Sequence, residues 1–238
     1  MKKIVTTPNK LLPGFGHRIF VWDYLQIKYG STHDIVLSPK VYKESEFIEF
    51  PNTKIEHIEK PRGLSWNCIF GTEVKMSLDR PLTNIKFDRD LVSLVRSKVI
   101  DMTGVHIRRG DLVDDGSKAY KEWSERDDDN WKHAYLNDEY YIKICDRIVE
   151  RNPREIFYLS TDAPLEEVKF FTDRYDVVMS DNLLLDKKDR PKWGFGVSYD
   201  LPEIGLHDIT DLLALSYCKK FIASNSMWSE FCSVYRKV

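Results

Sequence analysis

The chain has 238 residues, of which 42% are hydrophobic, 31% are charged and 13% are aromatic, and its formal net charge is −2. This composition can form a sizeable core and excludes an intrinsically disordered chain. The near-neutral charge gives no overall basic field for nucleic acid, and the length fits one large domain or two small ones.

The sequence carries no secretory or membrane signal. The stretch Met1–Pro8 has basic residues but lacks the apolar core of a signal peptide. No apolar run approaches the roughly 18 residues that a membrane span needs. The four cysteines are far apart and form no CxxC pair, so neither a zinc site nor a disulfide framework is indicated. We expect a soluble, cytoplasmic protein without a membrane span.

The first 38 residues predict a strand, a helix and a second strand, at residues 2–7, 19–29 and 34–38. The loop before the helix reads Leu12-Pro13-Gly14-Phe15-Gly16-His17-Arg18. Backbone N–H groups at such a helix start favour anions, although a tight turn that needs glycine explains the loop more simply. The Gly-Phe-Gly sequence is not GxGxxG, so no dinucleotide is inferred.

Proline and glycine interrupt residues 40–85 so often that this segment allows no assignment of elements. Asp90–Val99 has apolar residues at helical spacing and predicts a helix that leads into a central strand. In that strand Val105 and Ile107 alternate with His106 and Arg108, the pattern of a strand with one buried face.

The central strand ends at the turn Arg109-Gly110-Asp111. Two guanidiniums, an imidazole and a carboxylate therefore gather where a strand gives way to a loop, which is where ligands bind in open α/β sheets. Because arginine matches phosphate bidentately, the motif suggests a phosphate ester, such as that of a nucleotide. The alternative is an exposed arginine pair that ends a strand and forms a salt bridge with Asp111.

Residues 112–136 are strongly polar, and their role is left open. Asp127, Asp128 and Asp129 are explained better as an acidic surface loop than as a metal site. Trp123 and Trp131 lie in the same segment, where they either stack on sugar rings or pin the loop to the body of the protein.

Strands and helices alternate through the rest of the chain, which predicts a doubly wound, mostly parallel sheet. Cys145 lies on the apolar stripe of the clearest helix and is interpreted as core packing, not as a nucleophile. The predicted helices are 138–151, 164–174, 208–217 and one from about 226, and the predicted strands are 155–160, 177–179 and 220–223.

Three predicted strands end in polar clusters: His106–Asp111, Ser160–Asp162 and Ser224–Ser226. Parallel topology brings these ends to one edge of the sheet. An arginine pair, an Asp-capped helix and a serine-rich helix start could together hold a nucleoside diphosphate.

The same residues resemble a known family. Gly104–Asp111 is similar to the HxRRxD motif of the α1,2-, α1,6- and protein O-fucosyltransferase superfamily, and Phe157–Asp162 and Asp211–Ser226 resemble its second and third motifs. The α1,2 branch is the most similar, because its members also read Cys-Lys before a strand and Asn-Ser after it. The loop Gly14-Phe15-Gly16-His17-Arg18 is similar to the family's glycine loop.

The resemblance implies a GT-B-like α/β fold with two Rossmann-type doubly wound domains and the nucleotide-sugar site in the C-terminal one. We expect an N-terminal, acceptor-side domain at 1–100 and a GDP-sugar-binding domain at 101–225, with the last helix, about 226–238, packing back on the first. The implied reaction is inverting transfer of L-fucose from GDP-fucose to a hydroxyl of a glycan or glycoconjugate, with no metal and no further cofactor.

The resemblance also implies roles by position. Arg108 would bind the β-phosphate, His106 and Asp211 would read the guanine, and Ser226 with its helix start would contact phosphate. Arg109, Asp111 and Asp162 resemble pocket-lining or bracing residues. The remaining residues expected at the donor are Ser224, Asn225, Gly14, Phe15 and Gly16.

The general base is not fixed by the sequence, and the candidates are His17, Asp114, Asp115 and Glu122. His17 is placed first, beside Arg108 as the catalytic pair, because its loop is expected to face the sugar. Two other functions remain open: transfer from another GDP-sugar such as GDP-mannose, and an inactive module that binds a nucleotide or a glycan.

Overall fold

A computed structural model gives the fold and describes residues 3–6, 25–26, 29, 31–37, 48–49, 53–55, 86–109, 135–184 and 205–236. The structure is a mixed α/β arrangement with parallel sheets, as predicted. Its clearest part is a four-stranded sheet in the order β8-β7-β6-β9, in which every pairing is parallel. The strands are β6 (Thr103–Ile107), β7 (Ile156–Thr161), β8 (Asp176–Val178) and β9 (Lys220–Ile222).

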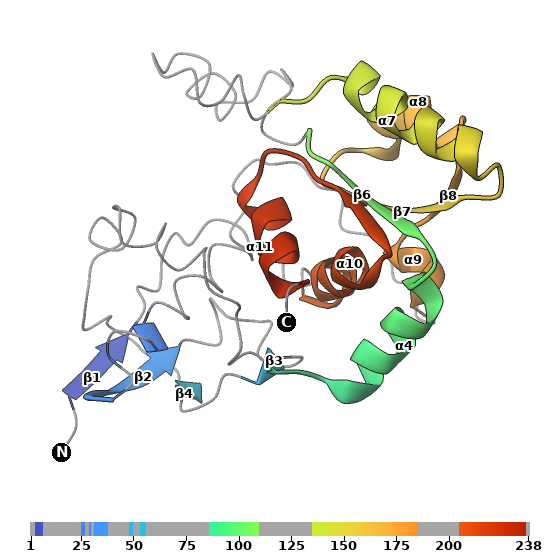
Figure 1. Ribbon diagram of the computed structural model, residues 1–238. Helices are drawn as coiled ribbons and strands as arrows, with labels where there is room; N and C mark the ends of the chain where they lie inside the picture. The colour runs from blue at the N-terminus through green and yellow to red at the C-terminus, as the bar shows by residue number, and fades with distance from the viewer. Residues whose placement is uncertain are drawn as a thin grey trace, which may run out of the picture.

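Helices cover both faces of this sheet (Figure 1). On one face lie α7 (Asp138–Arg151) and α8 (Lys169–Thr172), over a core that contains Val105, Ile107 and Phe157. The other face packs against α10 (Gly205–Tyr217), joined in one core by α4 (Arg89–Val99) and α11 (Met227–Tyr235).

Successive residues of β6 point to opposite faces. The alternation predicted one buried face, but all five residues are buried, because helices cover both faces of the sheet. On the α10 side, Gly104 lies so close to α10 that a Cβ there would stand 3.1 Å from Leu215 Cδ2 and 3.3 Å from Cys218 Cβ. The absence of a side chain at Gly104 therefore allows the helix to pack directly on the strand.

Two helices begin at side-chain caps. The Asn137 side chain accepts a hydrogen bond from the Tyr140 N–H at the start of α7, and Asp88 accepts one from the Leu91 N–H at the start of α4. Side-chain acceptors of this kind satisfy N–H groups that have no partner within the helix. The starts of α4 and α7 are thereby fixed on the two sides of the sheet.

The N-terminal part contains a second parallel sheet in the order β1-β2-β4, and a small antiparallel pair of β3 with β5. Leu25 and Ile35 from this part belong to the same core cluster as α10. The strands are β1 (Lys3–Thr6), β2 (His33–Leu37), β3 (Ile48–Glu49), β4 (Thr53–Ile55) and β5 (Lys86–Phe87).

Three features differ from the sequence-based expectation. The helix predicted at 164–174 is a 3₁₀ helix, Leu165–Val168, followed by the short α8, and 3₁₀ turns are common where a helix starts. The short helix α9 (Ser180–Leu183) was not predicted, because four residues are too few to show a helical period. Strands β3 and β4 lie in the segment to which no elements were assigned.

Helices α4 and α11 both pack on α10, and the Tyr235 ring of α11 meets Phe87 of β5 edge to face at 5.1 Å. The predicted division at residue 100 thus separates α4 from the four-stranded sheet, although α4 packs on α10, which covers that sheet. The boundaries 1–100 and 101–225 stay a prediction.

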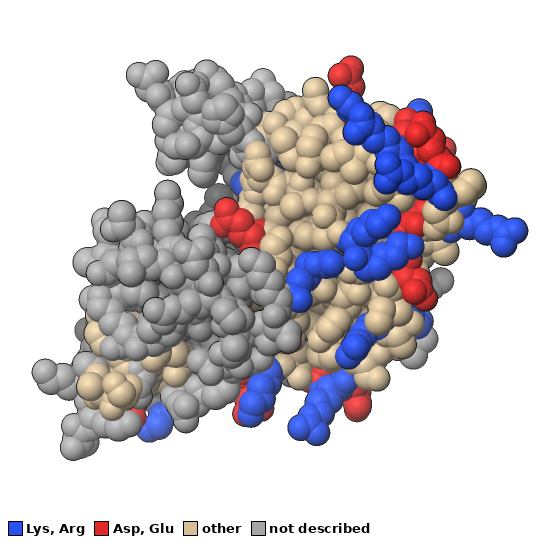
Figure 2. Space-filling model, viewed as in Figure 1, with Lys and Arg blue, Asp and Glu red and all other residues tan. Residues whose placement is uncertain are grey.

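Lys and Arg side chains spread from α7 to α4 on the face in view, with Asp and Glu side chains among them (Figure 2). This mixture agrees with the formal net charge of −2. Within the described residues, no helix is both long enough and apolar enough to cross a membrane.

A buried carboxylate ties the amino ends of three strands together. The Glu155 carboxylate, next to the start of β7, accepts hydrogen bonds from Thr103 Oγ1 of β6 at 2.6 Å, Asn152 Nδ2 at 2.7 Å and Lys219 Nζ at 2.8 Å. Burial alone would raise the pKa of Glu155, but these hydrogen bonds outweigh it and hold the pKa below its usual range. The charged carboxylate therefore stabilises the folded state.

We expect Glu155→Gln to lower the free energy of unfolding by about 1–3 kcal/mol at neutral pH. Because the folded-state pKa is depressed, the contribution of Glu155 is present above its unfolded pKa of about 4.3 and is lost as pH falls through the folded pKa. The gap between wild type and variant should close in acid. Urea unfolding across this range measures it.

Glu49→Gln is the matched control, since Glu49 forms an exposed ion pair with Lys86 at 3.5 Å and should matter little. If the difference in free energy of unfolding between wild type and Glu155→Gln stays constant from neutral pH into acid, the role of the charge is refuted.

Candidate functional site

The three predicted polar clusters meet at one edge of the sheet. Strands β7, β6 and β9 are neighbours and run parallel, so their carboxyl ends lie side by side. The backbone N–H of Arg109 donates to Asp162 Oδ1 at 2.7 Å, which joins the ends of β6 and β7. His106 Nδ1 lies 2.8 Å from Ser224 Oγ, which joins β6 to the segment after β9. The predicted convergence is confirmed.

The two adjacent arginines have different surroundings. Arg109 is buried, at 3% exposed, and Nη1 donates to the Leu136 carbonyl at 2.6 Å while Nη2 pairs with Asp138 Oδ1 at 2.5 Å. Its guanidinium lies 4.7 Å from the Tyr135 ring centroid. Arg109 therefore braces the end of β6 against the start of α7.

Arg108 is only half-buried, at the end of the same strand. Its positive charge contributes to the low pKa of His106. Of the arginine pair, Arg108 is the more exposed.

His106 is held by serine hydroxyls. Its Nδ1 lies 2.8 Å from both Ser224 Oγ and Ser229 Oγ, and 3.4 Å from Ser226 Oγ. Burial, and secondly the charge of Arg108, lower the pKa of His106 to about 3, so the imidazole is neutral at physiological pH. The hydrogen bonds found for His106 within the described residues are all at Nδ1.

Ser226 is the cap of α11. Its Oγ accepts the N–H of Ser229 at 3.1 Å, and Ser229 Oγ in turn accepts the N–H of Ser224 at 3.0 Å. The Ser226 hydroxyl is thus engaged with its own helix, whereas Asn225 between the two serines is exposed. Sequence reasoning missed Ser229, although a polar residue three positions after a cap is a recognisable pattern.

Asp211 lies on α10 and is 7% exposed. The hydroxyl of Tyr158, from β7, donates to Asp211 Oδ1 at 2.6 Å. Tyr158 itself is fully buried. A tyrosine from the sheet therefore holds the carboxylate on the helix.

Several predicted residues lie outside the described ones, and nothing tests their roles: Gly14, Phe15, Gly16, His17, Asp111, Asp114, Asp115 and Glu122. The aspartates at 127–129 and the tryptophans Trp123 and Trp131 also lie outside the described residues. Among the described residues, no group of three or more His, Cys, Asp or Glu could hold a metal ion.

Cys145 is completely buried, and burial raises the pKa of its thiol to about 12. The thiol is therefore protonated at physiological pH and behaves as core packing, as expected from its place on the apolar stripe.

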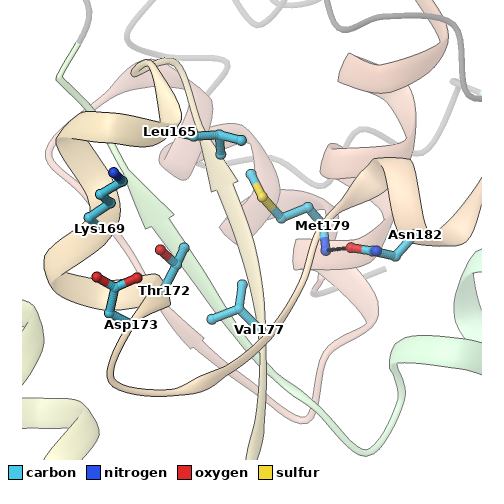
Figure 3. Close-up of a pocket in the computed structure, with 7 residues that line it drawn as sticks. All are labelled: Leu165, Lys169, Thr172, Asp173, Val177, Met179 and Asn182. Atoms are coloured by element: carbon cyan, nitrogen blue, oxygen red, sulfur yellow. Dashed lines mark hydrogen bonds between the residues drawn. The ribbon is translucent and has the colours of Figure 1, made fainter.

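The described lining of two surface hollows contains none of the predicted site residues. One, of about 300 Å³, is formed by α8, β8 and the segment after it (Figure 3). There the Asn182 side chain accepts the N–H of Met179 at 2.8 Å, so part of its polar lining is used internally. The other, of about 660 Å³, lies between β5, α4 and Tyr235.

No family model matches the sequence, and no curated protein matches it. The structure is similar to the crystal structure of NodZ alpha-1,6-fucosyltransferase co-crystallized with GDP, with a TM-score of 0.52 and 10% sequence identity, over 98% of this chain and 92% of that chain. The chain has a fucosyltransferase-like fold. A structure of Se-Met fucosyltransferase NodZ from Bradyrhizobium has a TM-score of 0.49 and 13% identity, over 98% of this chain and 92% of that one.

Proposed function

We propose that this protein is an inverting glycosyltransferase that moves L-fucose from GDP-fucose to a hydroxyl of a glycan acceptor. The observation that carries the proposal is that His106, Arg108 and the serine-rich start of α11 meet at the carboxyl edge of a parallel sheet, within a fold shared with a fucosyltransferase. We assign the protein to the fucosyltransferase superfamily, and the similarity of its third motif favours the α1,2 branch.

Arg108 is proposed to bind the β-phosphate of the donor. When the bond to fucose breaks, GDP leaves and negative charge grows on that phosphate. A fixed guanidinium stabilises this charge more in the transition state than in the ground state, and this lowers the barrier. Arg109 keeps the end of β6 in place, so that Arg108 need not be repositioned during the reaction.

Because Arg108 and the start of α11 supply positive potential, transfer should not require a divalent metal. We expect activity to survive excess EDTA. The assay is fucosyl transfer after chelation, with and without added magnesium or manganese. Complete loss that metal restores would contradict metal-independent transfer.

The guanine is proposed to lie against Asp211 and His106. The N1–H and N2–H₂ groups of guanine donate hydrogen bonds that a carboxylate can accept. GDP should therefore bind more tightly than UDP. Asp211→Asn replaces one acceptor oxygen by a donor, and we expect about tenfold weaker GDP binding, equal to about 1.4 kcal/mol, with little change for UDP.

Calorimetric titration of both nucleotides measures the effect, with Asp176→Asn as the control because Asp176 lies on β8 at the amino end of the sheet. Unchanged GDP affinity in Asp211→Asn would remove Asp211 from the base site.

Other assignments complete the proposal. Asp162 and Asp111 brace or line the pocket, and Ser224, Asn225 and Ser226 lie at the diphosphate. The loop Gly14-Phe15-Gly16-His17 would approach the sugar, with His17 as the first candidate for the general base. Residues 1–100 would hold the acceptor and 101–225 the donor.

The same edge could instead accept another GDP-sugar, because the proposed contacts are to GDP and not to the sugar. Measuring hydrolysis and transfer with GDP-fucose and GDP-mannose separates the two. Binding of GDP without turnover of any donor would favour an inactive binding module.

A further inference from the structure

Asp211 and His106 lie at the same height on the α10 face of the sheet. Leu215 of α10 faces Gly104 of β6, and α10 ends beside the amino end of β9, so the helix runs against the strands. Asp211 is four residues before Leu215, about 6 Å nearer the carboxyl edge, and His106 is two residues after Gly104, about 6.6 Å nearer it. The two proposed base-reading residues are therefore at the same height on the same face of the sheet.

Tyr158 pairs with Gly104 in the β7–β6 register, so it lies two residues farther from the carboxyl edge than His106. From there its hydroxyl reaches Asp211 Oδ1 at 2.6 Å. A short hydrogen bond to a carboxylate is stronger than one between neutral groups. Tyr158 has no exposed surface, so its ring cannot move aside to release the carboxylate without disturbing the core.

We propose that Tyr158 is a positioning residue for nucleobase specificity, whose hydroxyl orients the Asp211 carboxylate toward the guanine N1–H and N2–H₂ groups. This inference rests on the proposed function, because it assumes that Asp211 reads the base. Tyr158 does not touch the ligand and acts only through Asp211.

The test uses Tyr158→Phe, which removes the hydroxyl and keeps the ring. GDP and inosine diphosphate differ only in the 2-amino group, so the ratio of their affinities reports how well the carboxylate reads that group. We expect GDP to bind about five- to tenfold more weakly to the variant. The preference for GDP over inosine diphosphate should fall toward parity. A purely structural loss would weaken both nucleotides equally and leave the ratio unchanged.

A double variant gives a sharper result, because the inference predicts a rescue. In Asp211→Asn the Tyr158 hydroxyl keeps Oδ1 as its acceptor, so the amide Nδ2 faces the base. Nδ2 and the guanine N1–H and N2–H₂ groups are all donors, so they cannot hydrogen-bond to each other. Adding Tyr158→Phe removes the hydroxyl that holds Oδ1, so the amide can present its oxygen to the base instead. The double variant should therefore bind GDP several-fold more tightly than Asp211→Asn alone.

In Tyr158→Phe the buried Asp211 carboxylate loses its hydrogen bond, which destabilises the fold. The double variant lacks that carboxylate, so it still tests the role of Tyr158 if Tyr158→Phe alone does not fold. A double variant that binds GDP no better than Asp211→Asn, or a Tyr158→Phe variant with an unchanged GDP preference, would overturn the role of Tyr158. Failure of the proposed function looks different: wild-type protein would then bind GDP no more tightly than UDP, and the inference would fall with it.

Discussion

Replacing Arg108 by lysine should lower kcat/KM for fucosyl transfer by about ten- to a hundredfold while leaving the fold intact. Lysine keeps the positive charge but loses the planar fork that binds phosphate bidentately. A charge-assisted hydrogen bond contributes roughly 1.5–3 kcal/mol, and losing one that strengthens as GDP departs gives this factor. The loss should fall mainly on kcat, because the interaction is strongest in the transition state.

The stability of Arg108→Lys should change by no more than about 1 kcal/mol, since the side chain is half-buried at a strand end. Arg147→Lys, an exposed change on α7, is the matched control for both measurements. A folded Arg108→Lys enzyme with wild-type turnover would count against the proposed role of the central motif. An unfolded variant would place Arg108 among the structural residues.

Arg109→Lys, in contrast to Arg108→Lys, should cause a large loss of stability. A lysine cannot reach the Leu136 carbonyl and Asp138 together while stacking on Tyr135, so the buried site loses several contacts. Two hydrogen bonds from a charged group and a cation–π contact sum to about 3.5–8 kcal/mol, and because lysine keeps part of this we expect a loss of about 3–5 kcal/mol. For a chain of this size the unfolding temperature should fall by about 10 °C or more.

Arg174→Lys is the control, because Arg174 also forms a two-pronged pair with a carboxylate, Asp146, but its side chain is 52% exposed. The control should change stability only slightly, because solvent screens an exposed ion pair. Thermal and urea unfolding of both variants provide the comparison. Equal, small shifts for the two would show that Arg109 does not brace β6.

The arrangement of the sheet could be predicted because its signals are local. The alternation in β6, the apolar stripe of α7 and the strand–turn–helix order after residue 135 each depend on residues that are close in sequence. Parallel topology then required the ends of β6, β7 and β9 to meet at one edge. Strands β3 and β4 were not found, because proline and glycine interrupt residues 40–85 too often for a period to be read.

The division of labour between Arg108 and Arg109 could not be predicted, because the partners of Arg109 at 135–138 are distant in sequence. The Tyr158–Asp211 bond likewise joins residues 53 positions apart, and no pattern in either segment announces it. His106 was predicted to read the base, and the structure adds that serine hydroxyls from after β9 hold one of its ring nitrogens. Such contacts depend on how elements pack, which local sequence does not specify.

Incubating the protein with GDP-fucose and a glycan array tests the central claim most directly. GDP-mannose and a UDP-sugar serve as parallel donors, and Arg108→Lys serves as the matched enzyme control. We predict transfer of fucose from GDP-fucose to particular glycans, little or no transfer from the other donors, and a loss of about ten- to a hundredfold with Arg108→Lys. Transfer from GDP-mannose in preference to GDP-fucose, or GDP binding without transfer from any donor, would contradict the account.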